Sequence, residues 1–147
     1  MLQTVNQLLK LIKDTSENHN QVNKFLFAKD WDFETEGQVK YPLVGVALVQ
    51  PAQFITRVIE YDFTIWVADL VKKDRSNELE VLSDTIQIAV DIVSDLIQNN
   101  QDDEMEITQN ISYTPFTEKW DSEVSGWTFE LKIRVPSINN ECQIPKK

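Results

Sequence analysis

The chain has 147 residues, with 24 Asp and Glu against 14 Lys and Arg and a formal net charge of −10. This length suits one domain over residues 1–147, in which folding buries about 68–70% of the surface that the unfolded chain exposes. The negative charge argues against binding to nucleic acid or anionic membrane, and the single cysteine excludes an internal disulfide and a multi-cysteine metal site.

The N-terminal segment predicts an amphipathic helix from residue 2 to about 14, because Leu2, Val5 and Leu8 begin a helical repeat. The apolar stripe of this helix needs a partner. Farther on, residues 30–40 form an extended acidic arm in which carboxylates alternate with Trp31 and Phe33. We expect these two aromatic residues to contact another subunit.

Two strands are predicted next. The apolar run 42–49 indicates an inner strand, and a turn follows at 50–53. Residues 55–67 then alternate between apolar and polar side chains, which is the pattern of a strand with one buried face. Trp66 lies on the polar side of this alternation, so we expect it to touch another element or another subunit.

A long helix is predicted over residues 78–98, with Asn77 and Glu80 spaced as in a capping box. One apolar arc is wide enough to pack on a sheet: Leu79, Leu82, Ile86, Ala89, Val90, Val93, Leu96 and Ile97. Val81, Ile88 and Ile92 extend that arc beyond what one sheet can cover. This second stripe needs either the N-terminal helix or a neighbouring copy of the chain.

The last third predicts a β-hairpin. Residues 127–135 alternate strictly, and residues 107–113 form a weaker partner strand that stops near Pro115. The connection around 117–125 is long for a hairpin, so Trp120, Asp121 and Glu123 are candidate interface residues. The order helix, strand, strand, helix, strand, strand predicts an α+β fold of two layers, with a four-stranded antiparallel sheet and both helices on one face.

No catalytic or cofactor site is predicted. His19 lies in a polar link and is interpreted as a surface histidine, and Cys142 has no base among its neighbours. The alternating acids from Asp30 to Glu36 fail the EF-hand spacing, because Thr35 and Tyr41 occupy the positions that need glycine and glutamate. We therefore expect no enzyme, no metal and no cofactor.

The acidic side of the long helix allows three interpretations. Glu80, Asp84, Asp91 and Asp95 form a solvated face, which we favour, or a catalytic cluster, or a surface that mimics the charge of DNA. The longest apolar run, at 43–49, is far below the roughly 20 residues that cross a bilayer, and the first residues form no basic signal region. We expect a protein made in the cytoplasm.

Several segments carry a family resemblance. They are the acidic loop closing on Gly126 and Trp127, the alternating strand after it, a short tail with Cys142 and Pro145, and the segments 22–25, 41–43 and 77–91. In these the chain resembles the neck and tail-completion (tail-terminator-like) proteins of tailed bacteriophages, most closely versions from phages of gut Bacteroidales hosts, including the crAss-like group. Ala28 and Lys29 depart from the pattern, which usually has glycine there.

The resemblance implies a tail-terminator-like fold and a virion structural protein. Such a protein forms a homo-oligomeric ring in the neck or tail, acts as a head-tail connector beside portal-side or tail proteins, and lets DNA pass without specific binding. It is made in the host cytoplasm and does not enter a membrane. The alternatives are an acidic DNA-mimic module that acts on a host nucleic-acid enzyme, and a small hydrolase.

Overall fold

The computed structural model describes residues 5–27, 40–48, 53–55, 57–99, 105–108, 110–119 and 123–136. Within these ranges the chain is α+β, as predicted, and its elements follow in the order α1 (Val5–Glu17), β1 (Lys24–Phe27), β2 (Leu43–Leu48), β3 (Gln53–Ile55), β4 (Val58–Leu70), α2 (Glu78–Asn99), β5 (Glu106–Ile107), β6 (Thr114–Lys119) and β7 (Glu123–Pro136).

The described strands form one mixed sheet in the order β1-β2-β4-β7-β5, with β3 beside β4 and β6 beside β7. β1 and β2 are parallel and the other pairs are antiparallel. The sheet therefore has more strands than the four predicted, and it is not purely antiparallel. β1 and β3 are too short, at 4 and 3 residues, for their alternation to be recognised in the sequence.

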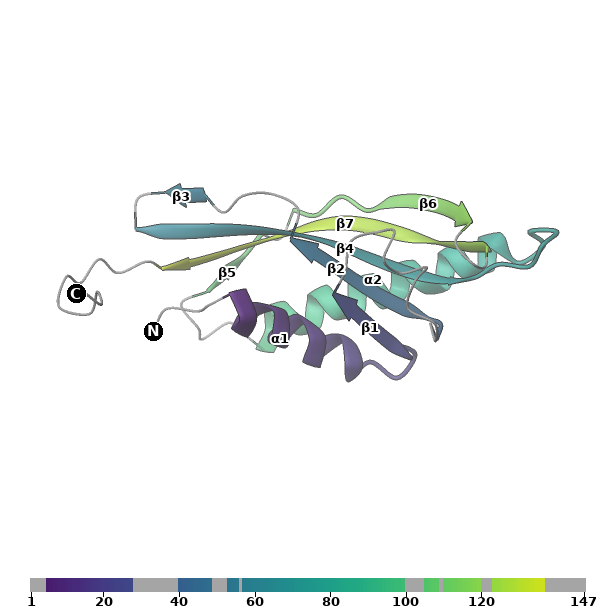
Figure 1. The fold of residues 1–147 in the computed structure, drawn as a ribbon, viewed down its shortest axis with the longest axis horizontal. Helices are drawn as coiled ribbons and strands as arrows, with labels where there is room; N and C mark the ends of the chain where they lie inside the picture. Colours follow the sequence, from purple (N-terminus) through teal and green to yellow (C-terminus); the bar gives the residue numbers. More distant parts are fainter. Residues whose placement is uncertain are drawn as a thin grey trace.

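The centre of the sheet is the pair of long strands β4 and β7, which run along the whole molecule (Figure 1). They pair without interruption from Val58 opposite Pro136 to Leu70 opposite Val124. Both predicted alternations are confirmed, because the odd-numbered side chains Phe63, Ile65, Phe129, Leu131 and Ile133 are buried on one face.

Both helices cover that same face, so the structure has two layers (Figure 1). The core between the layers joins side chains of both helices to the central strands. Its largest fully buried members are Leu8 and Ile12 of α1, Ile88, Ile92 and Leu96 of α2, and Phe63, Ile65, Leu131 and Ile133 of the sheet.

α2 lies with a different side toward the sheet than its sequence predicts. Its buried residues are Val81, Thr85, Ile88, Ala89, Ile92, Val93 and Leu96. Leu79, which we expected on the sheet, is 82% exposed, and Val90 is 38% exposed. The helix is therefore rotated about its axis relative to the prediction, and Val81, Ile88 and Ile92 belong to its buried face.

Two local predictions need correction, one at the end of α1 and one before α2. α1 (Val5–Glu17) continues three residues beyond the predicted end near 14, and the predicted start at residue 2 lies outside the described residues. Asn77 does not form the predicted capping box with Glu80. Its side-chain Oδ1 instead accepts a hydrogen bond from the backbone N–H of Lys72, at 2.8 Å, and so closes the turn before α2.

The partner strand predicted at 107–113 is wrong: among its described residues only Ile107 lies in a strand, β5, and the strand that forms the hairpin with β7 is β6, at 114–119. The hairpin connection is also shorter than predicted. β6 and β7 pair as far as Lys119 opposite Glu123, so the connection is confined to residues 120–122, outside the described residues. Pro115 lies inside β6 instead of ending it. An edge strand tolerates proline, because the missing N–H can face away from the neighbouring strand.

Gly126 is required by the close approach of β4 to β7. A β-carbon at this position would overlap the carbonyl oxygen of Val67 and would lie 2.9 Å from the Cα of Ala68. Both obstacles are backbone atoms of the adjacent strand, so no side-chain rotation relieves the overlap. The glycine of the Gly126-Trp127 pair therefore has a steric role in the sheet.

We expect Gly126→Ala to lower the free energy of unfolding by about 3 kcal/mol or more, because the added methyl group must push the two central strands apart. For a domain of this size that corresponds to a fall of roughly 6–12 °C in the midpoint of thermal unfolding. Thr128→Ala, on the same face of β7, is the control and should cost far less. Equal midpoints for the two variants would contradict the steric role.

Candidate interaction surface

The predicted second stripe of the long helix is covered within the chain. Val81, Ile88 and Ile92 are 6%, 1% and 1% exposed, and α1 packs against α2 beside them. Of the two partners that the sequence left open, the structure supports the N-terminal helix. These three residues are therefore core residues and are not available to a neighbouring copy of the folded chain.

Trp66 lies on the face of the sheet opposite the helices, because it alternates with the buried Ile65 and Val67. There it packs against a small cluster formed by Leu26 of β1 and Leu43 of β2, together with Tyr41. Trp66 is half-buried. It does touch other elements of its own chain, and this contact explains a tryptophan on an otherwise polar face.

The remaining candidate interface residues are placed as follows. Trp31, Phe33, Trp120 and Asp121 lie outside the described residues. Glu123 is the first residue of β7 and is half-buried, with its Oε2 atom buried and without a hydrogen-bond partner. Its backbone oxygen accepts a hydrogen bond from Val71 at 2.9 Å, which joins the ends of β4 and β7.

An apolar stripe that sequence reasoning assigned to the core remains accessible on α2. Leu79, Ile86, Val90 and Ile97 share one side of the helix, at intervals of seven, four and seven residues. Leu79 and Val90 are exposed, and Ile86 and Ile97 are half-buried. We call these four residues the α2 stripe. Its periodicity suits packing against another helix or strand.

A groove of about 460 Å³ continues the α2 stripe at its C-terminal end, between α2 and the segment before β6. Val90 and Ile97 line one wall, and Ile111 and Tyr113 line the other. The ring of Tyr113 is held by Phe129, at 4.9 Å between centroids, and burial raises the pKa of Tyr113 above its usual value of 10.0. The walls of this groove are therefore largely apolar, and Tyr113 in one of them is packed against the core residue Phe129.

The polar residues beside the α2 stripe are uncharged along most of its length. By helical position, Ser83, Gln87, Ser94 and Gln98 border the stripe on its solvent side, and all four are exposed. The carboxylates of Asp84, Asp91 and Asp95 lie farther round the helix. A second acidic chain could thus approach the stripe without bringing these carboxylates directly onto it.

The position of α2 on the sheet is fixed by the residue after Gly126. The indole Nε1–H of Trp127 donates a hydrogen bond to the backbone carbonyl of Leu82, at 2.8 Å. Near the start of the helix, the Thr117 hydroxyl donates to Oε1 of Glu78, at 2.9 Å. Both contacts tie α2 to the β6–β7 hairpin and so determine which side of the helix is exposed.

His19 is not the free surface histidine that the sequence suggests. Its Nε2 lies 3.0 Å from Oδ2 of Asp91, so it joins the end of α1 to the middle of α2. The backbone N–H of Gln21 donates to Nδ1, which leaves Nε2 as the atom that carries the proton toward Asp91. No sequence signal connects residues 72 positions apart, so this pair was missed.

The same pair weakens the interpretation of the acidic face as a DNA mimic. Hydrogen bonds from His19 and Gln87 hold the pKa of Asp91 below its usual value of 3.8, and Asp95 accepts a hydrogen bond from Asn99 at 2.8 Å. Two of the four carboxylates are thus already engaged by their own chain. A polar hollow of about 620 Å³ surrounds His19 and Asp91.

No group of three or more metal-ligating side chains occurs among the residues that the structure describes. Within the same ranges, neither helix combines the length and apolar character needed to span a membrane.

Comparison of the chain with protein-family models finds no match, and comparison with curated proteins also finds none.

The His19–Asp91 pair predicts a pH-dependent contribution to stability. Because the pKa of Asp91 is lowered in the folded chain, its stabilisation is complete above the unfolded value near 3.8 and is lost as the pH falls through the lower folded value. We expect Asp91→Asn to have a lower free energy of unfolding than the parent chain at pH 7, as measured by urea unfolding. The difference between the two should shrink as the pH falls below 3.8.

A double-mutant cycle with His19→Ala should give a coupling of about 0.5 kcal/mol at pH 7, since the carboxylate is partly solvated. Asp84→Asn, combined with the same His19→Ala, is the control and should show no coupling, because the side chain of Asp84 has no hydrogen bond to His19 within the described residues. Additive effects of His19→Ala and Asp91→Asn would contradict the contact.

Proposed function

We propose that this chain is a virion structural protein that assembles into a homo-oligomeric ring in the neck or tail of a tailed bacteriophage. The observation that carries the proposal is the α2 stripe, where Leu79 is 82% exposed in the free chain. The sequence resemblance to tail-completion proteins motivates the particular assembly, and the two-layer α+β fold is compatible with the tail-terminator-like fold that it implies.

The α2 stripe supports self-association because its burial is favourable and repeated. Covering a leucine side chain contributes about 1.5–3 kcal/mol before the cost of association is subtracted. Phe27 and Leu70 are also exposed, at 56% and 45%, at the ends of β1 and β4. In a closed ring every copy uses the same surfaces, so contacts that are individually weak add up around the ring.

The charge of the chain is compatible with DNA passage. At a formal net charge of −10, the protein offers few cations to phosphate groups. A passage lined with carboxylates would let the genome slide without specific binding. In this proposal the arm around 30–40 and the connection at 120–122 contact portal-side or tail proteins, as the resemblance implies.

We expect Leu79→Glu to weaken self-association while leaving the fold intact. The new carboxylate sits in the first turn of α2, where negative charge is favourable to the helix, so we expect the variant to stay folded. Sedimentation velocity over a range of protein concentrations, together with negative-stain microscopy, should show rings for the parent chain and smaller species for the variant.

Asn6→Glu is the matched control, since it adds the same charge at an exposed position in the first turn of α1. It should assemble as the parent chain does. A parent chain that stays monomeric at every concentration, alone and with neighbouring virion proteins, would overturn the proposed function. Rings that form equally well with Leu79→Glu would place the interface elsewhere on the surface.

A further inference from the structure

A second surface lies where the edge of β7 is only partly covered. β5 ends with Ile107 opposite Ile133, and β6 begins with Thr114 opposite Thr128. Between these pairs β7 has the four residues 129–132, whereas the other segment has the six residues 108–113. Six residues cannot stay in register with four, so the described residues 110–113 have no paired partner on β7 and the ladder is interrupted there.

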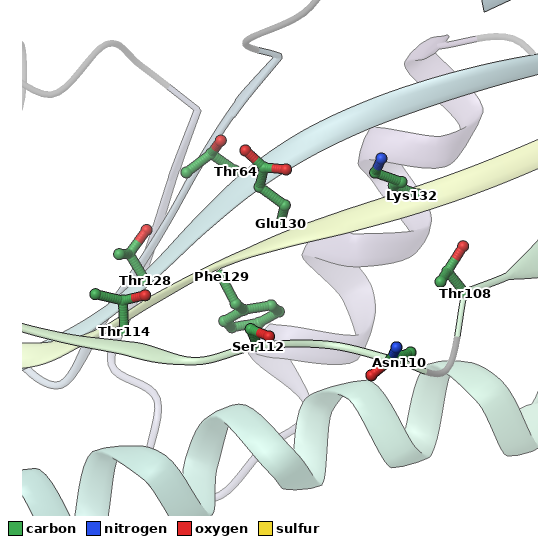
Figure 2. A pocket seen from close by; sticks show the side chains of 9 residues that line it. All are labelled: Thr64, Thr108, Asn110, Ser112, Thr114, Thr128, Phe129, Glu130 and Lys132. Atoms are coloured by element: carbon green, nitrogen blue, oxygen red, sulfur yellow. The ribbon is translucent and has the colours of Figure 1, made fainter.

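A polar groove of about 510 Å³ occupies this gap, which is a size typical of sites for small molecules. Figure 2 shows its lining side chains arriving from β4, from β7 and from the described residues between β5 and β6. Six of them are neutral and can both donate and accept hydrogen bonds: Thr64, Thr108, Asn110, Ser112, Thr114 and Thr128. None of these six side chains has a hydrogen-bond partner within the described part of the chain.

The charges in the groove cancel. Among the described residues that line it, Glu130 and Lys132 are the ionisable ones, and they stand on the same face of β7. A groove with one charge of each sign has no electrostatic preference for phosphate or for a cation. The net charge of −10 on the whole chain further disfavours an anionic ligand. The chemistry therefore selects a neutral ligand that is rich in hydrogen-bonding groups.

The backbone argues against an extended peptide as that ligand. Even-numbered residues of β7 direct their N–H and C=O groups toward this edge, because the carbonyl of Lys132 accepts a hydrogen bond from Thr108 at 3.1 Å. Thr128 is already opposite Thr114, so among the described pairings only Glu130 is left with backbone groups that face the gap unpaired. One residue is too short a stretch for a peptide to pair as an added strand.

We propose that this groove binds a neutral saccharide of about two sugar units. Adjacent sugar hydroxyls both donate and accept hydrogen bonds, which matches the hydroxyl and amide groups of the six neutral side chains. Thr114 and Thr128 form one end of the groove, and Thr64 stands beside Glu130 in the middle (Figure 2). The buried ring of Phe129 lies below this row and gives it a rigid floor. This proposal does not depend on ring formation.

The test is a titration of the ¹⁵N-labelled full chain with maltose, cellobiose, lactose and N,N′-diacetylchitobiose, followed by amide chemical shifts. We expect one or more of these sugars to shift amides of residues 110–114 and 128–132, with half-saturation at about 1–10 mM, the range of a shallow site. Glucose 6-phosphate and a short Gly-Ser peptide are the charged and peptidic comparisons, and both should bind more weakly.

The double variant Thr114→Val and Thr128→Val removes two facing hydroxyls and keeps the branched shape that suits a strand. It should bind the sugar at least about tenfold more weakly, while Ser83→Ala on α2 should bind as the parent chain does. Unchanged sugar binding by the double variant, no response to any of the four sugars, or tighter binding of glucose 6-phosphate or the peptide would each overturn the proposal.

Discussion

The close pairing of β4 with β7 is the constraint on which the remaining structure depends. The two strands run together from Val58 and Pro136 to Leu70 and Val124, and at Gly126 they leave no room for a β-carbon. Every other described strand joins this pair directly or through β2. The core face of the pair supplies the surface on which α2 packs, so the position of the helix follows from the position of these strands.

The rotation of α2 shows how polar contacts with the β6–β7 hairpin help to decide which apolar side chains are exposed. Helical periodicity makes Leu79 and Val81 almost equally suitable for burial, because both belong to a wide apolar arc. The indole of Trp127 resolves the choice by donating to the carbonyl of Leu82. With the helix held there and α1 covering its other flank, Val81 is buried and Leu79 is exposed. The apolar surface available to a partner is a consequence of this arrangement.

The sequence predicted the elements that are long and strongly patterned. The alternation of β4 and β7 fixes their inner faces, and the extent of α2 follows from its helical repeat. β1 and β3 were missed, because 3 or 4 residues carry no usable period and their pairing is decided by neighbours. The link from His19 to Asp91 and the groove beside β7 also depend on segments that come together only in the folded chain.

The segment that leads into β6 connects the two surfaces through its alternating side chains. Ile111 and Tyr113 face the apolar groove at the end of the α2 stripe, whereas Asn110, Ser112 and Thr114 line the polar groove. A tilted contact between the rings of Tyr113 and Phe129 holds this segment in place, and Phe129 also lines the polar groove. A partner bound in the apolar groove would therefore contact the same segment, residues 110–114, that places Asn110, Ser112 and Thr114 in the polar groove. The two surfaces are chemically distinct, but they share one structural support.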